Sequence, residues 1–165
     1  YPSHSNGGLI TVGCGFGKTV MALWIAAALG RKTLVIVHKD FLVKQWRERI
    51  QQYLPKARIG CIQGCVQDVE DKDIVIGMLQ SVSMKDYPEA IFSDFGFTII
   101  DECHHIAAEV FSRSLHKINT TYMLGLSATP HRKDGLSKVF EWFLGPYVFI
   151  QKENVVIVEP KNPFL

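Results

Sequence analysis

The chain has 165 residues, of which 47% are hydrophobic and 21% are charged. These proportions are typical of a globular protein, so they exclude a mainly disordered chain, and the length predicts one compact domain. The formal net charge of +2 is too small to indicate a nucleic-acid partner from composition alone.

Short β-branched runs alternate with amphipathic stretches from Leu9 onward, which is typical of a parallel sheet covered by helices on both faces. We predict strands at 9–12, 33–37, 59–62, 74–76, 97–100, 122–126 and 148–150. We predict helices at 18–29, 41–54, 108–117 and 136–143, the first of them ending at Gly30. The expected fold class is therefore α/β with a mostly parallel central sheet.

Other segments are expected to be irregular or to leave the domain. The polar and acidic segment 63–73 is predicted to be a loop, and 151–165, with its two prolines, is predicted to depart from the domain. No stretch approaches the roughly 20 apolar residues of a membrane span, and the first eight residues lack the basic start and the apolar run that we would expect of a signal peptide. We expect no membrane partner. The scattered cysteines predict free thiols in a reducing, intracellular location, and cytoplasm, nucleus and virion all stay open.

The predicted helix at 41–54 has a clear apolar face. Apolar residues recur there at spacings of four, four and three: Leu42, Trp46, Ile50 and Tyr53. Asp40 is predicted to cap the helix N-terminus. Phe41 and Trp46 are side chains that could stack on bases, but their helical spacing favours a place in the core.

A glycine-rich turn connects the first predicted strand to the first predicted helix. Its sequence is Gly13-Cys14-Gly15-Phe16-Gly17-Lys18-Thr19. In such a loop backbone N–H groups surround phosphate oxygens, the lysine reaches the β and γ phosphates, and the threonine hydroxyl binds Mg²⁺. The strict pattern needs glycine where Val12 stands, so this is a variant. The alternative is a turn with an incidental lysine, but the flanking strand and helix favour the phosphate loop.

Two carboxylates follow the predicted strand at 97–100. In P-loop NTPases an acidic residue at this place holds Mg²⁺, and a second carboxylate beside it orients or deprotonates the attacking water. Asp101 fits the metal role and Glu102 the water role. The alternative is a transition-metal site that includes His104 and His105, but these residues lack the H-E-x-x-H spacing and no third ligand is obvious.

A third polar element, Ser127-Ala128-Thr129, follows the predicted strand at 122–126. An esterase elbow of the form G-x-S-x-G would need glycine where Thr129 stands, and no Ser-His-Asp order supports one. Taken alone, the element indicates a solvated turn.

The three elements, in this order, resemble motifs I, II and III of superfamily 2 helicases of the D-E-x-H group. The segment 37–46, which ends in Gln45-Trp46, resembles motif Ia, and 74–81, which ends in Gln80-Ser81, resembles a later motif. The resemblance covers about 8–150. It implies a three-layer, RecA-like P-loop NTPase domain that binds Mg-ATP and half of a nucleic-acid track.

Within that superfamily the chain is most similar to the XPB-like DNA helicases and their relatives in large DNA viruses. Segment 124–134 and Phe143-Leu144-Gly145-Pro146 carry this similarity. Arg132 and Asp134 match the ends of the branch's R-E-D element, whereas Lys133 departs in the middle. The branch favours DNA over RNA as partner. A restriction-system motor subunit and a non-hydrolysing RecA-like scaffold that binds nucleic acid stay open as alternatives.

Residue chemistry and the resemblance together assign the site. The predicted catalytic residues are Glu102 and Lys18. The predicted ATP-binding residues are Gly13, Cys14, Gly15, Phe16, Gly17, Lys18 and Thr19. Mg²⁺ is expected at Thr19 and Asp101. The resemblance implies coupling between nucleotide and nucleic acid through His104, Ser127 and Thr129. It implies nucleic-acid contacts at His38, Lys39, Gln80, Ser81 and Arg132.

The resemblance also implies a larger arrangement. The helicase domain is expected at 1–150, and the tail at 151–165 is expected to lead to a second RecA-like domain of the same parent chain. Nothing here resembles motifs IV to VI or their arginine finger, which contributes about 10³ to 10⁵ in rate. We therefore expect an ATP-dependent helicase or translocase whose 165-residue portion alone binds nucleotide weakly and hydrolyses it slowly.

Overall fold

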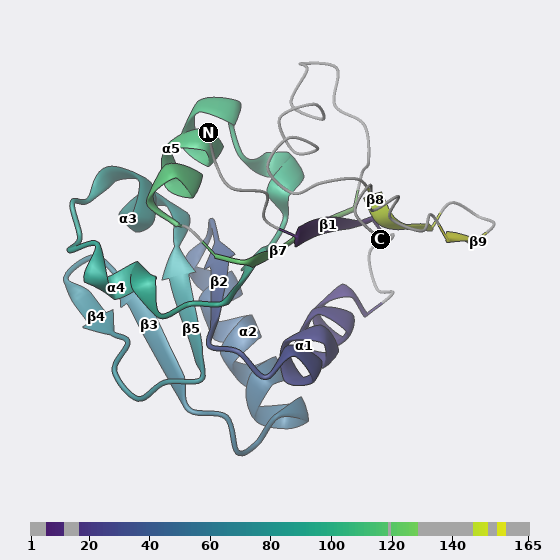
Figure 1. Cartoon of the computed structure of the whole chain (residues 1–165), viewed down its shortest axis with the longest axis horizontal. Coiled ribbons are helices and arrows are strands. Elements are labelled where there is room, and N and C mark those ends of the chain that lie inside the picture. The colour runs from purple at the N-terminus through teal and green to yellow at the C-terminus, as the bar shows by residue number, and fades with distance from the viewer. Residues whose placement is uncertain (1–5, 12–16, 119, 129–146, 152–154, 158–165) are drawn as a thin grey trace.

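The computed structural model describes residues 6–11, 17–118, 120–128, 147–151 and 155–157. Its strands form one sheet in the order β4-β3-β5-β2-β6-β7-β1-β8-β9 (Figure 1). Their bounds are β1 Asn6–Thr11, β2 Thr33–Val37, β3 Ile59–Gln63, β4 Val66–Asp68, β5 Ile74–Met78, β6 Phe97–Ile100, β7 Tyr122–Ser127, β8 Tyr147–Gln151 and β9 Val155–Ile157. Neighbours run parallel except at the two edges, where β4 and β9 pair antiparallel with β3 and β8. The mostly parallel sheet is confirmed.

Helices cover both faces of this sheet. Their bounds are α1 Lys18–Leu29, α2 Asp40–Tyr53, α3 Leu79–Met84, α4 Ala90–Ser93, the 3₁₀ turn η1 Cys103–His105 and α5 Ala108–Lys117. Alternating residues of β2 pack against opposite helix layers. Leu34 and Ile36 pack with α3, α4 and α5, whereas Val35 and Val37 pack with α1 and α2. The predicted three-layer α/β architecture is confirmed.

Both ends of α1 are set by glycines with a left-handed backbone. Gly17, at the N-cap, has φ 73°, and Gly30, at the C-cap, has φ 61° and donates its N–H to the carbonyl of Ala26. A side chain is disfavoured at such angles, so glycine is required at these two positions. The predicted helix at 18–29 and its end at Gly30 are confirmed.

The sequence prediction lacks several short elements, among them β4, α3 and α4. The segment predicted to be a loop contains β4, because Gly64 (φ 59°) allows a turn that folds Val66–Asp68 back onto β3. All three β4 residues are exposed, so the sequence has no alternation of apolar and polar residues there that would predict a strand. The others, α3 and α4, are too short to show a helical period. The predicted helix at 136–143 lies outside the described residues.

The start and the apolar face of α2 differ from prediction. Lys39, not Asp40, is the N-cap, and Asp40 Oδ1 instead accepts a hydrogen bond from Gln63 Nε2 at 2.6 Å. Leu42, Trp46 and Ile50 are buried as predicted. Two further aromatic side chains, Phe41 and Tyr53, are 63% and 43% exposed, so they lie outside the core in which they were predicted.

Strand β9 lies within the segment that we expected to leave the domain, and it pairs with β8. The division between 150 and 151 stays a prediction. Among the helices that the structure describes, none is long and apolar enough to cross a membrane.

Candidate functional site: a nucleotide-binding edge

The carboxyl ends of the parallel strands bring the predicted motifs to one edge of the sheet. Strand β6 lies between β2 and β7 and pairs in parallel with both. Asp101 and Glu102 directly follow β6, Ser127 ends β7, and His38 directly follows β2. Because these strands share a direction and a register, residues far apart in the sequence meet at this edge.

The first turn of α1 faces the end of β6. Lys18 Nζ lies 3.7 Å from Glu102 Oε1, and the two side chains are only 11% and 26% exposed. Thr19 follows Lys18 in the same turn. The predicted phosphate-binding lysine therefore lies beside the predicted catalytic base. The predicted positions Gly13, Cys14, Gly15 and Phe16 lie outside the described residues.

Asp101 is buried, with 7% of its surface exposed. Its Oδ2 accepts a hydrogen bond from the indole Nε1 of buried Trp46 at 2.7 Å, and its Oδ1 accepts one from the backbone N–H of Glu102 at 2.9 Å. Burial raises the pKa of Asp101, and the Trp46 hydrogen bond opposes this by stabilising the carboxylate. Each carboxylate oxygen keeps a further lone pair, so Asp101 fits the predicted Mg²⁺ role together with Thr19.

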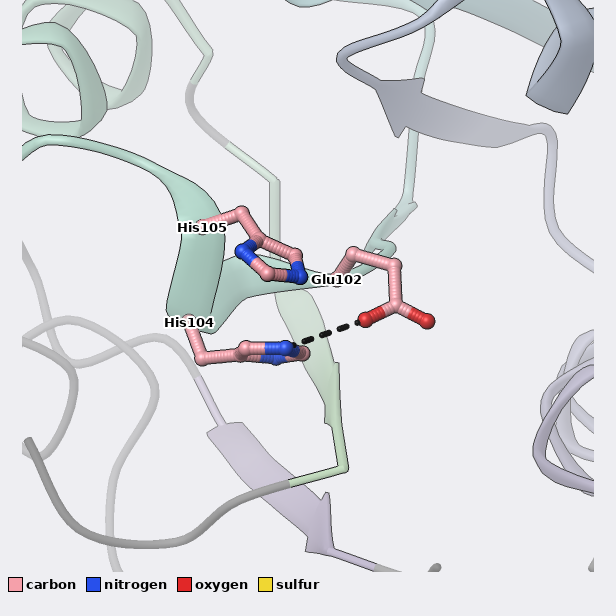
Figure 2. A group of neighbouring side chains, drawn as sticks. All are labelled: Glu102, His104 and His105. Carbon is pink, nitrogen blue, oxygen red and sulfur yellow. Dashed lines mark ion pairs between the residues drawn. The ribbon is translucent and has the colours of Figure 1, made fainter. Parts of the chain in front are cut away.

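Glu102 lies at the centre of a chain of polar contacts. Its φ of 49° places it in the left-handed region, which is uncommon for a residue with a side chain. His104 Nε2 lies 3.3 Å from Glu102 Oε2, as the dashed line in Figure 2 shows. The other ring nitrogen, Nδ1, lies 3.0 Å from Ser127 Oγ. Lys18, Glu102, His104 and Ser127 thus connect the three predicted motifs, whereas Thr129 lies outside the described residues.

The side chain of His105 lies next to this series of contacts (Figure 2). Its ring centroid lies 4.0 Å from that of His104. Glu102, His104 and His105 offer ligand atoms that all lie within 4.8 Å of one another. The tight turn η1 thus brings both histidines to the carboxylate, a proximity that the sequence did not make obvious.

Two of the predicted nucleic-acid-binding residues lie together at this edge. Gln80 Nε2 donates a hydrogen bond to the backbone carbonyl of His38 at 2.9 Å, and the His38 ring centroid lies 5.6 Å from that of His105. Burial lowers the pKa of His38, and the positive charges of His105 and Lys39 lower it further. Its Nδ1 is buried and finds no hydrogen-bond partner among the described residues.

The other predicted nucleic-acid contacts are more dispersed. Ser81 Oγ accepts a hydrogen bond from the backbone N–H of Gly64 at 2.9 Å, so it supports the turn between β3 and β4. Lys39 is exposed, and its Nζ lies 5.9 Å from the centroid of the Phe41 ring. Arg132 lies outside the described residues.

Two contacts were missed by reasoning from sequence. Helical spacing predicted that Trp46 is buried, and a buried indole N–H needs an acceptor, but no local pattern identified Asp101, which is 55 positions away. The approach of His105 to Glu102 follows from no spacing motif, because such a motif does not describe a 3₁₀ turn.

The family model described as "Type III restriction enzyme, res subunit" matches residues 3–132. The chain belongs to this family. Over 157 residues it is 40% identical to the "Putative ATP-dependent RNA helicase L396" of Acanthamoeba polyphaga mimivirus, a match that covers 94% of this chain and 30% of that protein. Over 142 residues it is 33% identical to the "DNA 3'-5' translocase XPB2" of Sulfurisphaera tokodaii, covering 86% of this chain and 31% of that protein. The chain therefore spans about a third of the length of these relatives.

The fold of this restriction-enzyme family member is also similar to solved helicase structures. The UvsW helicase of bacteriophage T4 superposes with a TM-score of 0.69 at 24% sequence identity, over 86% of this chain and 54% of that chain. The predicted RecA-like fold and the predicted similarity to viral and XPB-like superfamily 2 helicases are confirmed.

Proposed function

We propose that this chain is the ATP-binding half of an ATP-dependent helicase or translocase. The observation that carries the proposal is the connected series Lys18, Glu102, His104 and Ser127. It links a phosphate-binding lysine to a carboxylate base and then to the end of the next strand. A glycine-rich turn with an incidental lysine would not require such a series.

Each residue has a chemical role in ATP hydrolysis. The phosphate oxygens are assigned to the N–H groups of 13–17, as the glycine-rich sequence suggests, and the Lys18 ammonium offsets their charge. Thr19 and Asp101 would hold Mg²⁺, which would neutralise charge on the phosphates. Glu102 orients the attacking water and accepts its proton. Its second oxygen lies 3.3 Å from His104, so the orientation of this carboxylate depends on the His104 and Ser127 contacts.

The same contacts provide a route between nucleotide and nucleic acid. His104, Ser127 and Thr129 are the proposed coupling residues, and Ser127 ends a strand at the edge where His38 and Gln80 also lie. Nucleic acid is proposed to contact His38, Lys39, Gln80, Ser81 and Arg132. These contacts are made to phosphates, since a translocating motor cannot depend on base sequence.

DNA is the proposed nucleic acid. One relative is named as an RNA helicase and another as a DNA translocase, so the names alone do not choose between them. The resemblance of 124–134 to the XPB-like branch supports DNA. We also propose that a second RecA-like domain of the same parent chain completes the site, in keeping with the greater length of the relatives.

A motor subunit of a restriction system is the second candidate, favoured by the description of the matching family model. It uses the same ATP chemistry, so the residue roles above apply to it unchanged. A nuclease domain in the complete protein would favour this candidate, and an arginine finger on a second RecA-like domain would favour the helicase.

Nucleotide binding tests the proposed site directly. Lys18→Ala is expected to weaken binding of Mg-ATP to the chain by about 10- to 100-fold, because a charge-assisted contact to phosphate contributes about 1.5–3 kcal/mol. Lys44→Ala removes an equal charge from an exposed position of α2 and should leave affinity unchanged. Titration with a fluorescent ATP analogue measures both, and equal affinities in the two variants would refute the assignment of Lys18.

A further inference from the structure

The turn after β6 holds a compact set of metal-binding side chains that the proposed ATP chemistry does not use in full. Glu102, His104 and His105 each direct a ligand atom toward a common volume, within 4.8 Å of one another (Figure 2). The proposed Mg²⁺ residue Asp101 is engaged elsewhere, with Trp46 and the backbone of Glu102.

The spacing of two of these atoms matches a tetrahedral zinc site. Zn²⁺ binds imidazole nitrogen and carboxylate oxygen at about 2.0–2.1 Å, so adjacent ligand atoms of a tetrahedron lie roughly 3.3–3.4 Å apart. His104 Nε2 and Glu102 Oε2 are already separated by 3.3 Å. The third ligand atom, on the exposed side chain of His105, lies within 4.8 Å of these two.

The surroundings of His104 also suit a metal ligand. Histidines that bind metals usually engage their second ring nitrogen in a hydrogen bond, which fixes the orientation of the ring. His104 Nδ1 lies 3.0 Å from Ser127 Oγ, and this contact directs Nε2 toward Glu102.

The donor set selects the type of metal. Two imidazoles and one carboxylate suit Zn²⁺ and its neighbours in the first transition series. Mg²⁺ prefers an all-oxygen, octahedral environment, so it does not compete at these histidines.

We propose that Glu102, His104 and His105 bind Zn²⁺, with water as the fourth ligand, and that zinc binding inhibits ATP hydrolysis. Inhibition follows because Zn²⁺ occupies the carboxylate that orients the attacking water. Zinc binding itself is independent of the proposed function, whereas the inhibition rests on it.

Metal titration of the 165-residue chain tests the binding. Cys61→Ser and Cys65→Ser serve as the background, since thiolates at these accessible positions would compete for the metal. Zn²⁺ is titrated by calorimetry, and Co²⁺ is used as a spectroscopic substitute whose visible absorption reports tetrahedral coordination. His105→Ala is expected to weaken binding at least tenfold and to abolish the tetrahedral spectrum, whereas His116→Ala, an exposed histidine of α5, should change neither.

Binding that is unaffected by His105→Ala, or absent at millimolar Zn²⁺, would overturn the site. The second arm measures Mg-ATP hydrolysis by the complete protein with and without Zn²⁺. Zinc should inhibit the wild-type protein but not His105→Ala, with each protein compared with its own turnover without zinc. Equal inhibition of both proteins would refute the proposal that zinc at this site inhibits ATP hydrolysis. If the protein binds zinc but has no ATPase activity, the zinc site stands, and only the proposed function and the inhibition that rests on it are refuted.

Discussion

The hydrogen bond between Trp46 and Asp101 joins the core of the domain to its nucleotide-binding edge. The indole is 1% exposed and the carboxylate 7% exposed, so neither has an alternative partner in water. Burial raises the pKa of Asp101, and the folded state therefore holds its proton more tightly than the unfolded state does. The ionised carboxylate consequently costs stability as the pH rises through the folded pKa, and the Trp46 N–H reduces that cost.

Trp46→Phe should lower the free energy of unfolding by about 2–3 kcal/mol at neutral pH, since a hydrogen bond to a buried charged group is lost. The loss also raises the pKa of Asp101 further. The destabilisation should therefore be smaller in mildly acidic buffer, where Asp101 is more often protonated. Urea denaturation at the two pH values measures both effects.

Trp24→Phe is the matched control, because the Trp24 side chain is 73% exposed on α1. Its effect should stay within about 0.5 kcal/mol at either pH. An equal effect of the two substitutions, or a Trp46→Phe penalty that does not depend on pH, would contradict the role given to this hydrogen bond.

Among the elements, the hairpin of β3 and β4 depends on the absence of a side chain at Gly60. A Cβ atom at Gly60 would lie 2.0 Å from the backbone oxygen of Asp68, a contact that cannot form. The two strands pair through Cys61 and Asp68, Ile62 and Gln67, and Gln63 and Val66. Glycine at position 60 therefore permits the edge strand to close on its neighbour.

Gly60→Ala should displace β4 and cost about 2–3 kcal/mol, within the range for an overpacked site. Gly30→Ala meets no atom within 4 Å and is strained only by its positive φ, so it should cost about 1 kcal/mol. Hydrogen exchange separates the two: Gly60→Ala should lose protection in β3 and β4, whereas Gly30→Ala should affect only the end of α1. Unchanged protection of the hairpin in Gly60→Ala would refute the role of this contact.

For the chain as a whole, the sequence predicted the structure best where apolar residues repeat with a clear period or where several motif residues lie close together. The parallel strands β2, β5, β6 and β7 were predictable from their apolar β-branched runs, and α1 from its glycine ends. The Lys18 to Glu102 pairing was implied by motif chemistry, although no sequence pattern supplies its distance of 3.7 Å. Strand β4 and helix α4 were missed because three or four residues show no period.

The proximity of His105 to Glu102 was also beyond sequence reasoning, because it depends on the 3₁₀ turn η1. The exposure of Phe41 follows from helical geometry, since Phe41 precedes Trp46 by five positions and so lies on a different side of α2. Helical spacing correctly predicted burial of Trp46 and wrongly grouped Phe41 with it.

The rate at which this chain alone hydrolyses ATP depends on whether its ATP site is complete. If a second RecA-like domain supplies an arginine finger, the 165-residue chain should turn over Mg-ATP about 10³-fold or more slowly than the complete protein. Steady-state phosphate release at matched concentrations measures the ratio. Comparable turnover numbers would mean that this chain already holds the full hydrolytic site.

The most direct test of the proposed motor is Mg-ATP hydrolysis by the complete protein, assayed without nucleic acid and with duplex DNA, single-stranded DNA or RNA. We predict stimulation by DNA, and a loss of about 10²- to 10⁴-fold in Glu102→Gln, which removes the general base. Glu109→Gln, at an exposed position of α5, should behave as wild type. Turnover that persists in Glu102→Gln, or that is absent under every condition, would contradict an ATP-driven function built on this site.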